Sequence, residues 1–197
     1  MTLVEARRVT PAGISRAAEG MAPIFAHTPL VHHDDIDSWL GTRVALKVET
    51  LGPIRSFKGR GGYWYMRERD SRNPVCAASA GNFGQALAYA ARDAGVQCTI
   101  FASVNASPLK VARMRALGAN VKQQGADFDE AKDAAQAYAD EQGVEFVEDG
   151  RALAITEGAG TIGVEIAASA PRHTLLVPPG NGAILAEVAP WRKCAPP

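Results

Sequence analysis

The sequence lacks an excess of charge of either sign. Lysine and arginine together number 21, and so do aspartate and glutamate, with no block in which basic residues gather. Proteins that bind nucleic acid or an anionic membrane through electrostatics present a positively charged surface, and this balance argues against that class. We therefore expect neither nucleic acid nor a membrane as a partner.

Cysteine and long apolar runs are also scarce. The three cysteines are an odd number without CxxC spacing, which argues against a disulfide framework and against a zinc site. The four histidines have no metal-ligand spacing with acidic or cysteine partners, so we expect no metal. No segment approaches the ~18 uninterrupted apolar residues of a membrane span, and the charged N-terminus does not resemble a signal peptide. These absences predict a cytoplasmic protein.

From Val75 onward, short β-rich runs alternate with segments of helical pattern. Such alternation is typical of βαβ units around a parallel sheet. Pro108 suits the first position of a helix, and Gly95, Gly118 and Gly143 suit helix ends. The sequence thus predicts an α/β fold, with strands at 44–48, 75–78, 98–102, 120–122, 145–147 and 174–177.

Lys58 stands in the run Ser-Phe-Lys-Gly-Arg-Gly, where a strand and a turn lead to a helix start. A lysine beside Arg55 and Arg60 is most often a solvated residue of a basic turn. A lysine that forms a Schiff base needs an uncharged amine for part of the time, and neighbouring cations with partial burial favour that state. The position of Lys58 alone leaves both interpretations open.

Two further segments run from the end of a strand into the first turn of a helix. The loop at 79–82, Ser-Ala-Gly-Asn, offers backbone N–H groups at a helix N-terminus, which suit a substrate carboxylate. A plain helix N-cap is the alternative. The turn at 180–183, Gly-Asn-Gly-Ala, suits a phosphate group, and a tight turn without a ligand is its alternative. The three segments together are far more specific than any one of them.

In this order and spacing, the segments resemble the fold type II family of pyridoxal-phosphate enzymes, and most of all its threonine/serine dehydratase (threonine ammonia-lyase-like) branch. The resemblance covers nearly all of residues 28–188. It implies a tryptophan synthase β-like fold with two parallel-sheet, three-layer domains. A small α/β domain at 73–149 would be inserted into a large cofactor domain made of 1–72 and 150–197. We expect this large domain to be incomplete, truncated at its C-terminal end.

The resemblance implies a cofactor, pyridoxal 5′-phosphate, and residues that hold it. Lys58 would form the Schiff base and later move the α-proton, while Phe57 packs beside the cofactor. Asn82 would donate a hydrogen bond to the 3′-oxygen of the ring. The phosphate would be bound where two of the family's usual four glycines are replaced by asparagine and alanine, at Gly180, Asn181, Gly182 and Ala183.

The resemblance also implies a substrate site and a reaction. The substrate would be bound by Ser79, Ala80, Gly81 and Asn82, with its carboxylate held by the backbone N–H groups of the first three and by the Ser79 hydroxyl. In racemases that resemble this family, a serine at the position of Ala80 protonates the opposite face, which alanine cannot do. The reaction implied is therefore β-elimination from L-threonine, L-serine or a related 3-hydroxy amino acid, giving a 2-keto acid and ammonia. We expect a homo-oligomeric enzyme.

Two alternatives stay open. The first is a truncated or degenerate family member that binds pyridoxal phosphate without turnover. The second is a non-catalytic interaction protein that keeps only the α/β scaffold. The run at 158–163 also matches GxGxxG, but the residues before it do not form a clean strand pattern, so we expect no dinucleotide site there.

Overall fold

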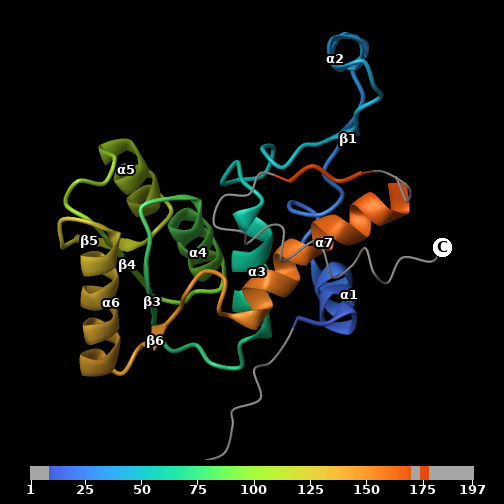
Figure 1. Cartoon of the computed structure of the whole chain (residues 1–197). Helices are drawn as coiled ribbons and strands as arrows, with labels where there is room; N and C mark the ends of the chain where they lie inside the picture. The colour runs from blue at the N-terminus through green and yellow to red at the C-terminus, as the bar shows by residue number, and fades with distance from the viewer. Residues whose placement is uncertain (1–8, 170–173, 178–197) are drawn as a thin grey trace, which may run out of the picture.

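The structure is a computed structural model that describes residues 9–169 and 174–177. Figure 1 shows the arrangement of its helices and strands. The helices are α1 (Pro11–Gly20), α2 (Asp34–Leu40), α3 (Lys58–Glu68), α4 (Asn82–Asp93), α5 (Pro108–Ala116), α6 (Phe128–Gln142) and α7 (Leu153–Ser169). The strands are β1 (Leu30–Val31), β2 (Leu46–Lys47), β3 (Val75–Ala78), β4 (Cys98–Ala102), β5 (Asn120–Gln123) and β6 (Glu145–Phe146). In this part of the chain, no helix combines the length and the apolar character needed to cross a membrane.

Four strands form a parallel sheet in the order β5-β4-β3-β6. The chain moves from β3 through α4 to β4, and through α5 to β5, in one direction across the sheet. It then returns through α6 to β6 on the other edge of β3. Right-handed crossovers therefore place α4 and α5 on one face and α6 on the opposite face (Figure 1). The α/β fold with a parallel sheet is confirmed, and the strands at 75–78 and 98–102 have the predicted bounds.

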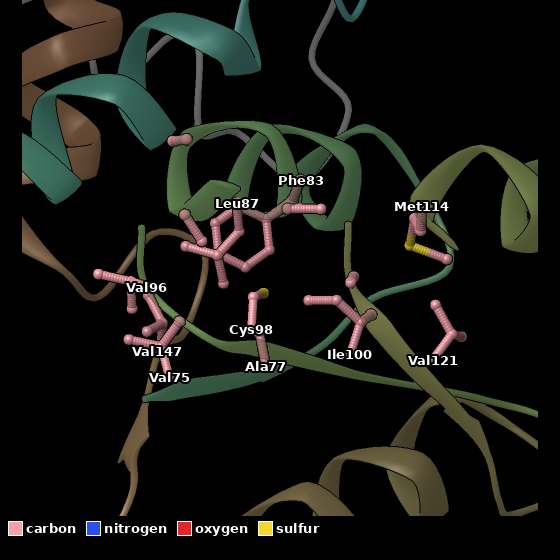
Figure 2. Close-up of a cluster of buried hydrophobic side chains, with 14 of the residues drawn as sticks. Val75, Ala77, Phe83, Leu87, Val96, Cys98, Ile100, Met114, Val121 and Val147 are labelled. Carbon is pink, nitrogen blue, oxygen red and sulfur yellow. The ribbon is translucent and has the colours of Figure 1, made fainter. Parts of the chain in front are cut away.

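A hydrophobic core fills the space between this sheet and α4. Phe83 and Leu87 of α4 point toward Cys98 and Ile100 of β4 (Figure 2). All five residues of β4 are buried, as expected for a central parallel strand covered by helices on both faces. Burying each large apolar side chain contributes ~1.5–3 kcal/mol. This core holds the carboxyl ends of β3 and β6 in fixed positions.

The predicted helix ends are confirmed by the backbone. Gly95, Gly118 and Gly143 have φ angles of +67°, +98° and +62°, which end α4, α5 and α6. Glycine adopts this left-handed conformation without steric cost. Pro108 is the first residue of α5, where its missing N–H would have no helical partner.

Helices α3 and α7 pack at close range because both carry glycine at the contact. A Cβ atom on Gly158 would lie 2.6 Å from the carbonyl oxygen of Arg60, and one on Gly61 would lie 2.6 Å from that of Ile155. The GxGxxG run at 158–163 is therefore part of a helix-packing surface inside α7. It does not follow a strand, which a dinucleotide-binding turn requires.

Strands β1 and β2 form a separate two-stranded antiparallel sheet, in which the strand predicted at 44–48 is shortened to Leu46–Lys47. Helix α2 lies between them in the chain and extends away from the rest of the described structure (Figure 1). It has no buried residue, and Trp39 on it is 82% exposed. Three aspartates in its first turn suit the positive end of the helix dipole.

The predictions for the C-terminal segment have two outcomes. The strand predicted at 174–177 is wrong, because these four residues are irregular and Leu176 is 86% exposed. A strand is stabilised by pairing with a neighbour, and no strand of the described residues pairs with them. The predicted phosphate-binding residues lie outside the described residues: Gly180, Asn181, Gly182 and Ala183.

Candidate active site

Lys58 is the first residue of α3 and is only 8% exposed. Its backbone N–H donates to Ser56 Oγ at 3.3 Å, so the serine orders the turn that leads into the helix. The Lys58 Nζ atom lies 4.9 Å from the centroid of the Phe57 ring. The interpretation of Lys58 as a solvated surface lysine is therefore wrong.

The Lys58 side chain faces a carboxylate. Its Nζ donates to Asp149 Oδ1 at 2.9 Å, and the side chains of Lys58 and Asp149 are 10% and 21% exposed. Arg60, which we expected to place a positive charge beside Lys58, donates instead to Glu49 and Glu165. For Arg60, the predicted place beside the Lys58 amine is thus wrong, because Arg60 lies two positions further along α3 and points to a different side.

Arg60 is the centre of a buried network. It is fully buried, its Nη1 lies 2.6 Å from Glu165 Oε1, and its Nη2 lies 2.8 Å from Glu49 Oε1. The hydroxyl groups of Thr28 and Thr161 accept further hydrogen bonds from the same guanidinium. This network ties α3 to α7 and to the strand β2 region, and so fixes the helix that begins with Lys58.

The charges of the network shift one carboxyl strongly. Burial by itself raises the pKa of Glu165, but hydrogen bonds from Arg60 and Lys47 outweigh burial and lower this pKa to about 2. The pKa of the Arg60 guanidinium is shifted in the opposite direction. Burial lowers the pKa of Arg60, and its bonds to Glu165 and Glu49 more than offset burial, leaving it above its ordinary value.

The loop after β3 places hydrogen-bond donors at the start of α4. Ser79 Oγ accepts from the backbone N–H of Gly81 at 3.2 Å and of Gly84 at 3.0 Å, which leaves its own O–H free to donate. Within residues 9–169 and 174–177, the N–H groups of Ala80 and Asn82 donate to no acceptor. Of the four residues of the predicted anion site, Ala80 and Asn82 thus keep free backbone N–H groups. The N–H of Ser79 donates to the Phe101 carbonyl oxygen at 2.9 Å, and that of Gly81 donates to Ser79 Oγ.

Asn82 is the first residue of α4, and its side chain is exposed. A Cβ atom added to the preceding Gly81 would meet no atom within 4 Å, so open space lies beside this turn. The exposed Asn82 side-chain amide can therefore donate to a bound group.

A cavity of about 290 Å³ opens at the carboxyl ends of β3 and β6. The chain leaves β3 toward one face of the sheet and reaches β6 from the other, and ligands of open α/β sheets bind at such a switch point. The cavity is of the size of a small-molecule site, ~300 Å³. Its lining residues are Ala78, Ser79, Phe83, Phe128, Lys132, Phe146, Val147, Glu148 and Asp149.

Asp149 joins the two parts of the predicted site. It contacts Lys58 on one side and lines the cavity together with Ser79 on the other. The sequence motifs assign Asp149 no role, although its place three residues after β6, a strand that ends at the switch point, is a usable signal. Among the described residues, no group of three histidine, cysteine or acidic side chains is arranged to hold a metal ion.

The chain matches known proteins over most of its length. The family described as "Pyridoxal-phosphate dependent enzyme" matches residues 21–189. The mitochondrial threonine dehydratase of Schizosaccharomyces pombe is 40% identical over 146 residues, 73% of this chain and 24% of that protein. The L-threonine ammonia-lyase of Thermotoga maritima is 33% identical over 185 residues, 92% of this chain and 46% of that protein.

Solved structures agree with the sequence matches. The structure of maize serine racemase has a TM-score of 0.86 at 25% identity and covers 96% of this chain and 58% of its own. The chain thus spans about half the length, or less, of these relatives. The fold type II architecture and the pyridoxal-phosphate cofactor implied by the sequence are confirmed by these matches, and the chain belongs to the family of pyridoxal-phosphate-dependent enzymes.

Proposed function

We propose that the protein eliminates the β-hydroxyl group of L-threonine, L-serine or a related 3-hydroxy amino acid and releases a 2-keto acid and ammonia. The observation that carries this proposal is the place of Lys58. Its amine is buried, and it contacts Asp149, which lines a cavity at the switch point of the sheet. Relatives that are named threonine dehydratase and L-threonine ammonia-lyase support the choice of substrate class.

The groups around Lys58 fit the chemistry of pyridoxal phosphate. An aldehyde needs a primary amine, and Lys58 supplies one in a sheltered position. The ring of the cofactor needs a flat neighbour, which we assign to Phe57. The hydroxyl oxygen of that ring needs a hydrogen-bond donor, which we assign to the exposed amide of Asn82. The phosphate is assigned to the backbone N–H groups of residues 180–183, which lie outside the described residues.

The residues of the chain then have separate tasks. When bound, pyridoxal phosphate supplies an electron sink for the bonds around the substrate α-carbon. The free N–H groups of Ala80 and Asn82 and the Ser79 hydroxyl hold the substrate carboxylate at the positive end of α4. Lys58 Nζ takes the proton from the α-carbon as a general base. Holding the carboxylate fixes which face of the α-carbon meets Lys58.

Racemisation of an amino acid is the second candidate, favoured by the likeness to maize serine racemase. Ala80 argues against it, because a methyl group has no proton to deliver to the opposite face of the α-carbon. A chiral assay for D-serine after incubation with L-serine separates the two reactions. We expect keto acid and no D-serine.

We further propose that residues 73–149 form a small domain inserted into the cofactor domain. All four strands of the parallel sheet lie between Val75 and Phe146, which supports this division. The pair between Lys58 and Asp149 would then bridge the two domains, and the cofactor would bind between them. Assembly into a homo-oligomer and a cytoplasmic location stay predictions.

Adding pyridoxal phosphate to the purified protein tests the proposal. We expect visible absorbance of a lysine adduct and keto acid from L-threonine or L-serine. Lys58→Ala should abolish both, whereas Lys110→Ala, at an exposed position of α5, should change neither. Cofactor uptake without keto acid would favour the family member without turnover. An absence of uptake would favour the non-catalytic interaction protein.

A further inference from the structure

Two adjacent carboxylates at the cavity have different partners. Glu148 receives two cations, because Lys132 Nζ lies 2.5 Å from its Oε1 and Arg151 Nη1 lies 3.1 Å from its Oε2. Asp149 contacts the Lys58 amine, and no second cation contacts it within the described residues. Glu148 therefore keeps its partners whatever happens at Lys58, while Asp149 does not.

Under the proposed function, on which this inference rests, the Lys58 amine is bonded to the cofactor when the amino acid arrives. The ammonium gives a proton to water, and the neutral amine condenses with the cofactor aldehyde with loss of one water. The nitrogen then no longer carries the three N–H donors of an ammonium group. The carboxylate of Asp149, which is only 21% exposed, then lies at the cavity wall without the ammonium group that it bound before. Such a carboxylate is costly unless another cation replaces the first.

We propose that Asp149 is a substrate-binding residue that holds the α-ammonium group of the incoming amino acid. Asp149 lines the same cavity as Ser79, whose loop offers N–H groups for the substrate carboxylate. The carboxylate of a zwitterionic amino acid is thus bound by N–H donors, and its ammonium group is bound by the Asp149 carboxylate on the wall of the same cavity. Asp149 alternates between two cations, the Lys58 amine before the cofactor is attached and the substrate ammonium afterwards. It selects amino acids over acids that lack the amino group.

Binding of two small ligands to the cofactor-loaded protein tests this role without turnover. L-Alanine has both charges but no β-hydroxyl group to lose, and propanoate keeps the carboxylate without the ammonium. Asp149→Asn should weaken L-alanine ~10–100-fold, the size of a lost charge-assisted hydrogen bond, and propanoate less than ~3-fold. Glu148→Gln is the matched control, because it removes the neighbouring charge of the same cavity, and it should change L-alanine binding less than ~3-fold.

Two further variants separate binding from folding. Asp149→Glu keeps the charge and should retain most of the affinity for L-alanine, whereas Asp149→Ser should lose it as Asp149→Asn does. The inference is overturned if the neutral variants bind L-alanine as tightly as the natural protein, or if they lose L-alanine and propanoate equally. A natural protein that takes up no cofactor would instead contradict the proposed function.

Discussion

Two neighbouring regions of this molecule are held together by different forces. The parallel sheet and its helices, from β3 to β6, are held by an apolar core in which Leu87 and Ile100 are fully buried. The junction of α3 and α7 is held by ion pairs around Arg60, which is equally buried, and by glycine contacts such as that of Gly158. Both regions are buried, but only the second is centred on ion pairs.

The difference follows from what each region positions. Apolar packing is tolerant of small shifts, and it is sufficient to hold the carboxyl ends of the strands that surround the cavity. The buried pairs of Arg60 are directional, because a guanidinium binds carboxylates in a fixed plane. They fix the direction of α3 and therefore the place of Lys58 at its first turn. The charged region fixes the position of Lys58, and the apolar region fixes the strand ends that surround the cavity.

Arg60→Ala breaks the charged region and should have the largest effect on stability. It removes the cation that binds Glu49 and one of the two cations that bind Glu165, and both carboxylates are largely buried, so we expect a cost of ~3–5 kcal/mol in the free energy of unfolding. Urea unfolding measures this loss. Arg151→Ala is the control, because the Arg151 side chain is 79% exposed and its pair with Glu148 should contribute ~0–1 kcal/mol.

The same comparison is sharpened by Ile100→Ala in the apolar region. Removing this buried side chain should cost ~2–5 kcal/mol, close to the cost of Arg60→Ala. If the account is right, only Arg60→Ala also weakens attachment of pyridoxal phosphate under conditions in which both variants are folded. Equal weakening by both would show that the two regions do not have separate tasks.

Acid should weaken the charged region before the apolar one. The pKa of Glu165 is about 2, below its ordinary 4.5, so its contribution is fully present above pH 4.5 and is lost as the pH falls toward 2. The loss is on the order of 3 kcal/mol. The free energy of unfolding, measured from about pH 6 down to about pH 2, should therefore fall as the pH is lowered. In Glu165→Gln the slope should be shallower, and an unchanged slope would contradict the assignment.

The sequence was informative where local rules decide the structure. Strand positions, the glycine helix ends and the burial of Lys58 within a specific motif follow from periodicity, backbone freedom and resemblance. The hydrogen-bond partner of Lys58 does not follow from these rules, because Asp149 is 91 positions away in the chain. Arg60, although it is close to Lys58 in the chain, points away from it and binds Glu165. The failed strand at 174–177 has the same cause, since pairing depends on a neighbour that periodicity does not reveal.

A smaller effect is expected at the glycine contact of the charged region. In Gly158→Ala the added methyl group would lie 2.6 Å from the Arg60 carbonyl oxygen, so α3 and α7 must move apart. Overpacking of this kind costs ~1–3 kcal/mol. Thermal unfolding measures it. A variant as stable as the natural protein would show that the two helices separate freely.

The smallest effect is expected outside both regions, at α2. Trp39 is 82% exposed, so Trp39→Ser should change the free energy of unfolding by less than ~0.5 kcal/mol. Urea unfolding at several protein concentrations checks this. A large loss of stability would show that α2 packs against another surface in solution.

The most direct test of the account is to locate the lysine that binds the cofactor. The protein is incubated with pyridoxal phosphate, reduced with borohydride, digested and mapped by mass spectrometry. We expect the cofactor to be fixed on Lys58, and we expect Lys110→Ala to retain this label while Lys58→Ala loses it. A label on another lysine, or a label that survives in Lys58→Ala, would contradict the account.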